Sequence, residues 1–168
     1  IPAKITFRGL GDTAVPSLGP AYRAAGARNV VFTGTGNGET LIPPGFYETA
    51  VSRGIEYTTY QERVSVEAGE TAVLKAKLER VVDTTGCVSA DFHLHTDHST
   101  DSNITLRDRV IGLAAEGVEF AVASDHYDMA DYAGTIRELG LQGELNSSTG
   151  YEVTASGTIH FNVFPLQA

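Results

Sequence analysis

The 168-residue chain has one cysteine, Cys87, and no tryptophan. A single cysteine excludes an internal disulfide, and with it the small folds that depend on a disulfide framework. No apolar run approaches the roughly 18 residues needed to span a bilayer, and no secretory signal peptide is visible. We therefore expect no membrane segment and a soluble protein, either cytoplasmic or secreted with its signal removed.

Basic residues are also scarce, since 12 Lys and Arg stand against 21 Asp and Glu and the net charge is −9. A field of this sign repels polyanions, so we expect no nucleic-acid partner. The same field can concentrate cations in a cleft, which favours a metal site. Histidine is absent from the first half of the chain, because all five histidines lie beyond residue 92.

Residues 1–80 contain short runs of β-branched and aromatic residues that are separated by glycine and proline, a pattern typical of strands. The expected strands are Ala3–Arg8, Asn29–Thr33, Phe46–Ser52, Ile55–Gln61 and Thr71–Leu78, with a small-residue loop at Gly9–Gly26. These features predict a small β-sandwich-like domain at 1–80, followed by a linker at 81–86.

Residues 87–168 follow a different rhythm, in which strand and helix patterns alternate. The expected elements are strands at Val88–Leu94, Val118–Ser124, Tyr151–Ala155 and Thr158–Phe164, and helices at Thr105–Glu116 and Met129–Leu139. Thr105 has the side chain of an N-cap, and Gly117 stands where the first helix should end. The alternation predicts a parallel α/β arrangement.

Two histidines, His93 and His95, lie two positions apart on an expected strand. Side chains at i and i+2 face the same side of a strand, so both imidazoles point at one place. Imidazole is a common ligand of zinc, manganese and iron. Taken alone, the pair is a weak metal signal, and two unrelated strand histidines explain it equally well.

Other polar residues strengthen the metal interpretation. Asp125 and His126 directly follow an apolar strand, and Glu152 and His160 lie in the last two strands. In parallel α/β folds the carboxyl ends of the strands form the functional face. Buried charged groups need partners or metals, and one shared metal cluster would satisfy all of them.

The polar loop after His95 leaves more than one interpretation open. His98, Asp97 and Asp101 either contribute to the site or form a solvated turn before the helix, and a turn is the favoured role for Asp97. Tyr127 and Asp128 either line the site or begin a loop, and the pattern does not choose between these roles.

These motifs resemble the PHP superfamily, the polymerase and histidinol phosphatase type of metallohydrolase. The resemblance is carried by Asp91-Phe92-His93-Leu94-His95, Ser99, Asp101-Ser102, Ser124-Asp125-His126, Gly150-Tyr151-Glu152 and His160-Phe161. The whole chain resembles the CehA/McbA group within that superfamily, named for carbaryl hydrolase. This further resemblance includes Pro44-Gly45-Phe46-Tyr47, Ser52-Arg53-Gly54-Ile55-Glu56-Tyr57 and Arg80-Val81-Val82-Asp83-Thr84.

The resemblance implies a distorted (β/α)7 barrel with two or three divalent zinc, manganese or iron ions at the strand ends. It assigns His93 and His95 as the first ligand pair, His126, Glu152 and His160 as later ligands with Glu152 bridging, and Asp101 as a further acid. Family members continue past the equivalent of His160 and supply more ligands, including an Asp-x-His pair. Residues 87–168 are roughly half of a barrel, so we expect an incomplete N-terminal portion that self-associates or is completed by a C-terminal fragment. By itself this portion is expected to be a weak hydrolase or inactive.

The predicted function is metal-dependent hydrolysis, in which a metal-bridged hydroxide attacks a small-molecule phosphoester, carbamate or other ester. Asp125 and His126 are the catalytic candidates, and His93, His95, Asp101, His126, Glu152 and His160 are the metal candidates. The alternative is a non-catalytic binding module that combines a β-sandwich with a structural metal site. Metal-dependent turnover would distinguish the two functions.

Overall fold

The computed structural model describes residues 1–20, 28–155 and 159–167. In these ranges the strands are β1 (Ala3–Gly9), β2 (Val30–Thr33), β3 (Gly45–Ser52), β4 (Tyr60–Val66), β5 (Ala90–Leu94), β6 (Phe120–Ala123), β7 (Asn146–Thr149), β8 (Tyr151–Ala155) and β9 (Ile159–Val163). The helices are α1 (Leu106–Ala115) and α2 (Ala133–Glu138). Residues 21–26 of the expected loop and Thr158 of the last expected strand lie outside the described residues.

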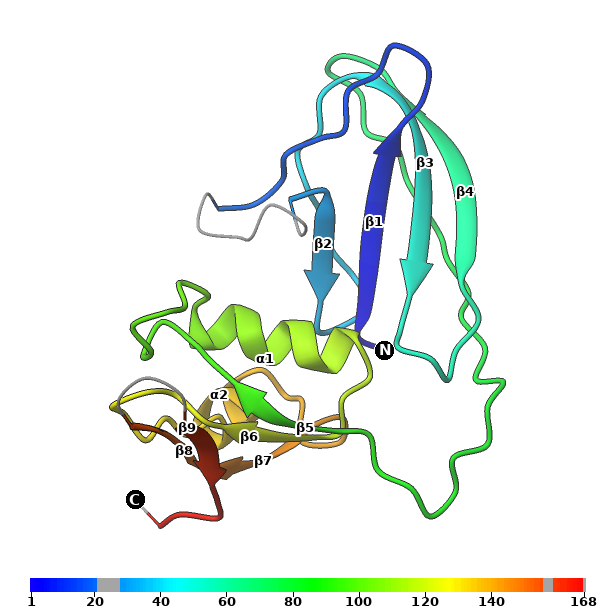
Figure 1. Ribbon diagram of the computed structural model, residues 1–168. Helices are drawn as coiled ribbons and strands as arrows, with labels where there is room; N and C mark the ends of the chain where they lie inside the picture. Colours follow the sequence, from blue (N-terminus) through cyan, green and yellow to red (C-terminus); the bar gives the residue numbers. More distant parts are fainter. Residues whose placement is uncertain (21–27, 156–158, 168) are drawn as a thin grey trace.

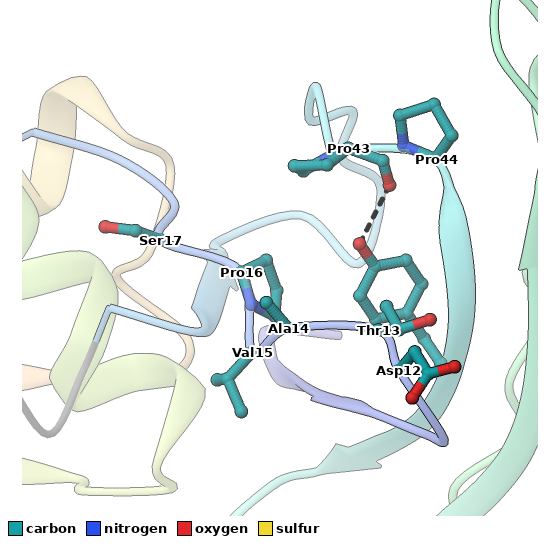
Figure 2. Close-up of a pocket in the computed structure, with 9 residues that line it drawn as sticks. Asp12, Thr13, Ala14, Val15, Pro16, Ser17, Pro43 and Pro44 are labelled. Atoms are coloured by element: carbon teal, nitrogen blue, oxygen red, sulfur yellow. Dashed lines mark hydrogen bonds between the residues drawn. The ribbon is translucent and has the colours of Figure 1, made fainter.

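The first four strands form an antiparallel sheet in the order β2-β1-β3-β4 (Figure 1). Along β3, buried Tyr47, Thr49 and Val51 alternate with less buried residues, which is the period of a half-buried strand. The Tyr47 hydroxyl donates a hydrogen bond to the carbonyl oxygen of Pro43, 2.8 Å away. Residues 12–17, 43, 44 and 47 border a cavity of about 430 Å³ beside this strand (Figure 2).

The sandwich predicted for residues 1–80 is wrong, because the described part of this range forms one sheet without a second sheet facing it. Two expected strands are also wrong. The strand expected at Ile55–Gln61 lies at Tyr60–Val66, and Thr71–Leu78 is not a strand. A strand is stable only when a neighbouring backbone takes its hydrogen bonds. Near this segment the only described bridge joins Tyr57 to Arg80, and Val73 remains 74% exposed.

Residues 90–149 form a parallel β-α-β-α-β unit with the sheet order β5-β6-β7. Helix α1 begins as expected, since the Thr105 side chain accepts a hydrogen bond from the amide of Asp108. It ends before Gly117, whose φ of 76° suits glycine. Neither described helix is long and apolar enough to cross a membrane. The fold is therefore mixed α/β, as predicted, with parallel and antiparallel sheets.

The core of the parallel unit lies between its sheet and its helices. Its buried residues come from β5, α1, β6, α2 and the segments on both sides of α2: Leu94, Val110, Leu113, Ala114, Ala121, Ala123, Ala130, Tyr132, Ile136, Leu141 and Leu145. Burial raises the pKa of the Tyr132 phenol. Because Leu94 is anchored in this core, its neighbours His93 and His95 lie on the opposite side of β5.

Strands β8 and β9 form a separate antiparallel hairpin (Figure 1). Few described hydrogen bonds attach this hairpin to the parallel sheet. The amide of Gly150 donates to Ala123, the side-chain amide of Asn162 donates to the carbonyl of Phe92, and the amide of Leu166 donates to Thr149. Glu152 and His160 both lie on this hairpin.

One end of the antiparallel sheet packs against α1, which contacts β1 and β2 (Figure 1). Arg53 is 6% exposed at this junction and pairs with Glu144, its Nη2 lying 2.5 Å from Glu144 Oε2. Lys4 pairs with Glu116 at the end of α1. A cleft of about 1140 Å³ opens between the two parts of the chain, with Arg53, Glu144 and Arg80 among its lining residues.

Gly54 makes the closest backbone approach at this junction, so Gly54→Ala should be strongly destabilising. Its φ is 52°, and an added Cβ would collide with the carbonyl oxygen of Glu116. Gly69→Ala is the matched control, because Gly69 also has a positive φ, 80°, but faces open space. We expect the control to lose about 1 kcal/mol from backbone strain, and Gly54→Ala about 3 kcal/mol from strain plus overpacking. Equal losses in urea denaturation would show that the collision is relieved without cost.

Candidate metal centre

The candidate ligands come from the ends of two neighbouring parallel strands and from the adjacent hairpin. His93 lies in β5, His95 follows its last residue, and His126 follows β6. Glu152 and His160 come from β8 and β9. The carboxyl ends of parallel strands lie at one edge of the sheet, and the hairpin meets them there.

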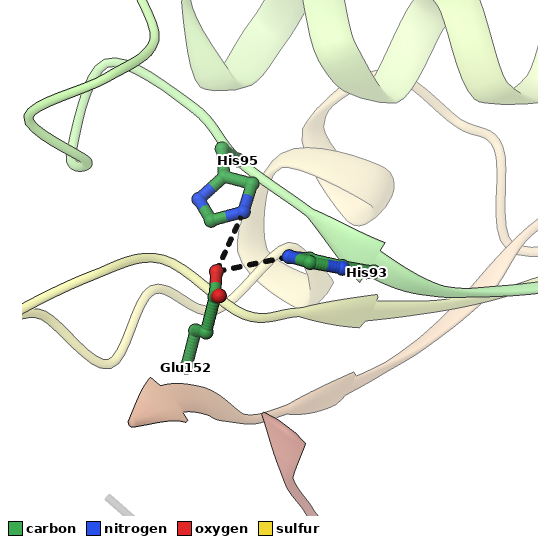
Figure 3. Close-up of side chains that lie close together, drawn as sticks. All are labelled: His93, His95 and Glu152. Carbon is green, nitrogen blue, oxygen red and sulfur yellow. Dashed lines mark hydrogen bonds and ion pairs between the residues drawn. The ribbon is translucent and has the colours of Figure 1, made fainter. Parts of the chain in front are cut away.

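Glu152 is the centre of this cluster and is 3% exposed. Its Oε2 atom lies 2.9 Å from His93 Nε2, 3.0 Å from His95 Nε2 and 3.2 Å from His126 Nε2. Its other oxygen, Oε1, lies 3.0 Å from His160 Nδ1. Figure 3 shows the rings of His93 and His95 directed at the same carboxylate oxygen. The structure thus brings together the four histidines that the sequence selected as metal candidates.

This donor set fits a transition metal. His93, His95 and Glu152 each offer one ligand atom within 4.8 Å of the others, and so do His95, Asp101 and His126. Imidazole nitrogens and carboxylate oxygens are the usual ligands of zinc, manganese and iron. Three ring nitrogens also crowd one oxygen here, more than its two lone pairs accommodate. His95 belongs to both groups, so the two candidate positions are adjacent.

The charge of the two carboxylates supports this interpretation. Burial acts to raise the pKa of Glu152, but the hydrogen bond from His93 and the nearby histidines outweigh it, and the pKa lies below its usual value. For Asp101, desolvation likewise acts to raise the pKa, whereas the hydrogen bond from Ser99 and the charges of His95 and His126 lower it overall. Both groups are therefore anionic at neutral pH and offset part of the charge of a bound cation.

Asp101 lies at the exposed rim of the cluster. Its side chain is 54% exposed, with Oδ1 3.5 Å from His95 Nδ1 and Oδ2 3.5 Å from His126 Nε2. These distances are longer than those around Glu152, because Asp101 belongs to the loop between β5 and α1 and not to a strand. The sequence left open whether Asp101 contributes to the site or forms a solvated turn. In the structure its carboxylate lies next to His95 and His126.

Asp125, predicted as catalytic together with His126, is fully buried. Its Oδ1 accepts a hydrogen bond from the amide of Thr96 at 2.5 Å, and its Oδ2 accepts one from the Thr96 hydroxyl at 3.0 Å. Both oxygens therefore hold the backbone that follows His95. The catalytic role of Asp125 stays a prediction, and the visible role of its carboxylate is to tie the ends of β5 and β6 together.

His98 pairs with Asp128, and neither belongs to the two ligand groups found among the described residues. His98 Nδ1 lies 2.5 Å from Asp128 Oδ2, and this hydrogen bond raises the pKa of His98. Tyr127 is 73% exposed with a φ of 62°, and its ring centroid lies 5.9 Å from that of His126. Asp128 thus pairs with His98 of the loop after β5, whereas Tyr127 lies next to the candidate ligand His126.

Three further residues contact the ligands and were not selected as candidates from the sequence. Thr154 Oγ1 lies 3.2 Å from the Nδ1 atoms of both His126 and His160. Arg109 donates two hydrogen bonds to the backbone carbonyl of His95, at 3.0 and 2.7 Å. Ser99 contacts the His95 ring. Strand periodicity could have predicted the contact of Thr154, because this residue lies two positions after Glu152 and shares its strand face.

Comparison with protein-family models, curated proteins and solved structures gives no match for this chain. The interpretation of the cluster therefore depends on its own geometry. That geometry offers two overlapping ligand groups built from the strand ends and the hairpin, and the functional argument starts from them.

Proposed function

We propose that this chain carries the metal site of a PHP-type metal-dependent hydrolase that cleaves a phosphoester, carbamate or other ester. The observation that supports this proposal is the convergence of three histidine Nε2 atoms on one oxygen of the buried Glu152. Within the same proposal, the parallel β-α-β-α-β unit is the first part of a distorted (β/α)7 barrel. The position of the cluster at the strand carboxyl ends agrees with such a barrel.

The candidate ligands form two overlapping groups that both include His95. Because one ring nitrogen binds one ion, His93, His95 and Glu152 would hold the first ion, and Asp101 and His126 would remain for a second. His160 would support Glu152 through its contact with Oε1. When bound, divalent metals of this kind lower the pKa of a coordinated water and polarise the substrate oxygen.

The protein's own groups hold the ligands in place. Contact of the Thr154 hydroxyl with His126 Nδ1 leaves His126 Nε2 directed at Glu152 and Asp101. Arg109 fixes the backbone of His95 from the helix side. The exposed rim at Asp101 leaves the cluster open to solvent on one side, where a small ester could approach.

Zinc titration of protein purified without chelator tests the proposal, with His93→Ala as the variant and His98→Ala, in the loop that follows β5, as the control. We expect His93→Ala to weaken zinc binding at least about 100-fold, because loss of supporting contacts alone costs 10–100-fold. His98→Ala should stay within about twofold, since His98 pairs with Asp128 and not with Glu152.

Turnover of a chromogenic phosphoester and of a carboxyl or carbamate ester, with added zinc or manganese, tests the reaction itself. Metal-dependent cleavage that is lost in His93→Ala is the expected result. Negligible metal binding by the wild-type chain would overturn the metal site. Tight metal binding without cleavage of any substrate would favour the structural site of a binding module instead.

A further inference from the structure

One buried hydroxyl contacts two of the proposed metal ligands. Ser99 is 4% exposed in the loop between β5 and α1. Its Oγ atom lies 3.0 Å from His95 Nδ1 and 2.9 Å from the backbone nitrogen of His126. Ser99 therefore links residues that follow β5 and β6.

The hydrogen-bonding capacity of a serine hydroxyl decides the direction of each contact. A hydroxyl has one proton to donate and two lone pairs to accept with. The backbone amide of His126 can only donate, so it occupies one lone pair of the Ser99 oxygen. His95 Nε2 is the nitrogen that faces Glu152, so an ion at the proposed site would take its lone pair and leave the ring proton on Nδ1. Nδ1 then donates to the second lone pair of the Ser99 oxygen, 3.0 Å away.

A proton on Nδ1 determines what the other nitrogen of His95 can do. In a neutral imidazole with Nδ1 protonated, Nε2 has a free lone pair. That lone pair lies 3.0 Å from Glu152 Oε2, so two acceptors would face each other. A cation bound by both atoms removes the repulsion. The same arrangement makes Nδ1 unsuitable as a ligand, although Asp101 Oδ1 lies 3.5 Å from it.

We propose that Ser99 is a positioning residue that holds the proton of His95 on Nδ1, so that His95 offers Nε2 to the metal. This inference rests on the proposed function and extends it to a residue that does not touch the metal itself. Partners of this kind fix the tautomer and the ring orientation of a ligand histidine, and their loss typically weakens metal binding 10–100-fold. The hydrogen bond from the His126 amide to Ser99 also fixes the position of His126 relative to His95.

The test compares Ser99→Ala with Ser102→Ala. Ser102 is a matched control because it belongs to the same loop, and its hydroxyl contacts two backbone groups, the carbonyl of His95 at 3.4 Å and the amide of Ile104 at 3.5 Å. We expect Ser99→Ala to weaken zinc binding 10–100-fold and Ser102→Ala to stay within about twofold. Ser99→Thr keeps a hydroxyl at the same atom and should recover most of the affinity.

Nitrogen-15 NMR of the histidine side chains supplies a readout that a general loss of stability would not produce. In the zinc-loaded wild-type protein, His95 should carry its proton on Nδ1. This measurement needs no substitution, so it holds even where Ser99→Ala folds poorly. A proton on Nε2 of His95, or zinc binding by a folded Ser99→Ala equal to that of the wild type, would overturn the role of Ser99 alone. Failure of the wild-type protein to bind zinc would overturn the proposed function as well.

Discussion

Replacing Glu152 with glutamine is expected to remove the proposed metal-dependent hydrolysis, with kcat/KM falling about 1000-fold. The substitution keeps the shape of the side chain but removes the negative charge on which His93, His95 and His126 converge. A metal contributes several kcal/mol of charge stabilisation to hydrolysis, and about 4 kcal/mol corresponds to a factor of 1000. Turnover and zinc content should be measured on the same preparation.

Glu138→Gln is the matched control for this experiment. Glu138 is 71% exposed at the end of α2, where it pairs with Arg107, and its loss should leave turnover within about twofold. If Glu152→Gln bound zinc and hydrolysed ester as well as the wild type, Glu152 would not be a ligand. The histidines would then have to bind a metal without Glu152.

Replacing Asp125 with alanine should destabilise the protein by about 3 kcal/mol. The buried amide and hydroxyl of Thr96 would both lose their acceptor, and each unsatisfied buried group costs about 1–3 kcal/mol. Urea denaturation measures the loss. Asp97→Ala, at an exposed position of the neighbouring loop, should change the free energy of unfolding by less than about 0.5 kcal/mol.

Asp125→Asn separates structural and catalytic roles further. The amide oxygen can still accept one of the two hydrogen bonds from Thr96, so a smaller loss of stability, about half that of alanine, is expected. A variant that unfolded like the wild type but had lost turnover would instead support the direct catalytic role predicted for Asp125.

Periodicity carried most of the fold prediction. The apolar runs that became β5 and β6, and the capped helix α1, were predictable because their own side chains supply the core. β7 was not predicted, since Asn146-Ser147-Ser148-Thr149 lacks apolar residues and is a strand only because β6 offers it a ladder. Thr71–Leu78 failed for the converse reason: it alternates like a strand, but no described strand forms a ladder with it.

The candidate ligands were predictable by residue type and strand position, whereas their supporting contacts were not. Alternation alone placed His93 and His95 on one face. No pattern indicates that Ser99 reaches back to the His95 ring or that Thr96 meets Asp125, because loop contacts have no period. The different directions of Asp125 and His126 agree with their adjacency, since consecutive residues in extended chain point to opposite sides.

Because the β8–β9 hairpin is a separate sheet, an ion bound at the site would also have a structural role. A two-stranded hairpin is marginally stable by itself. Apart from the contacts of Glu152 and Thr154 with His93 and His126, few described hydrogen bonds join this one to the parallel sheet. Glu152 belongs to the hairpin, while His93 and His95 belong to β5 and the residue after it. An ion held by all three would therefore act as a cross-link between two sheets. Its binding free energy would contribute to the stability of the hairpin's attachment, and chelation would loosen that attachment before the rest of the domain.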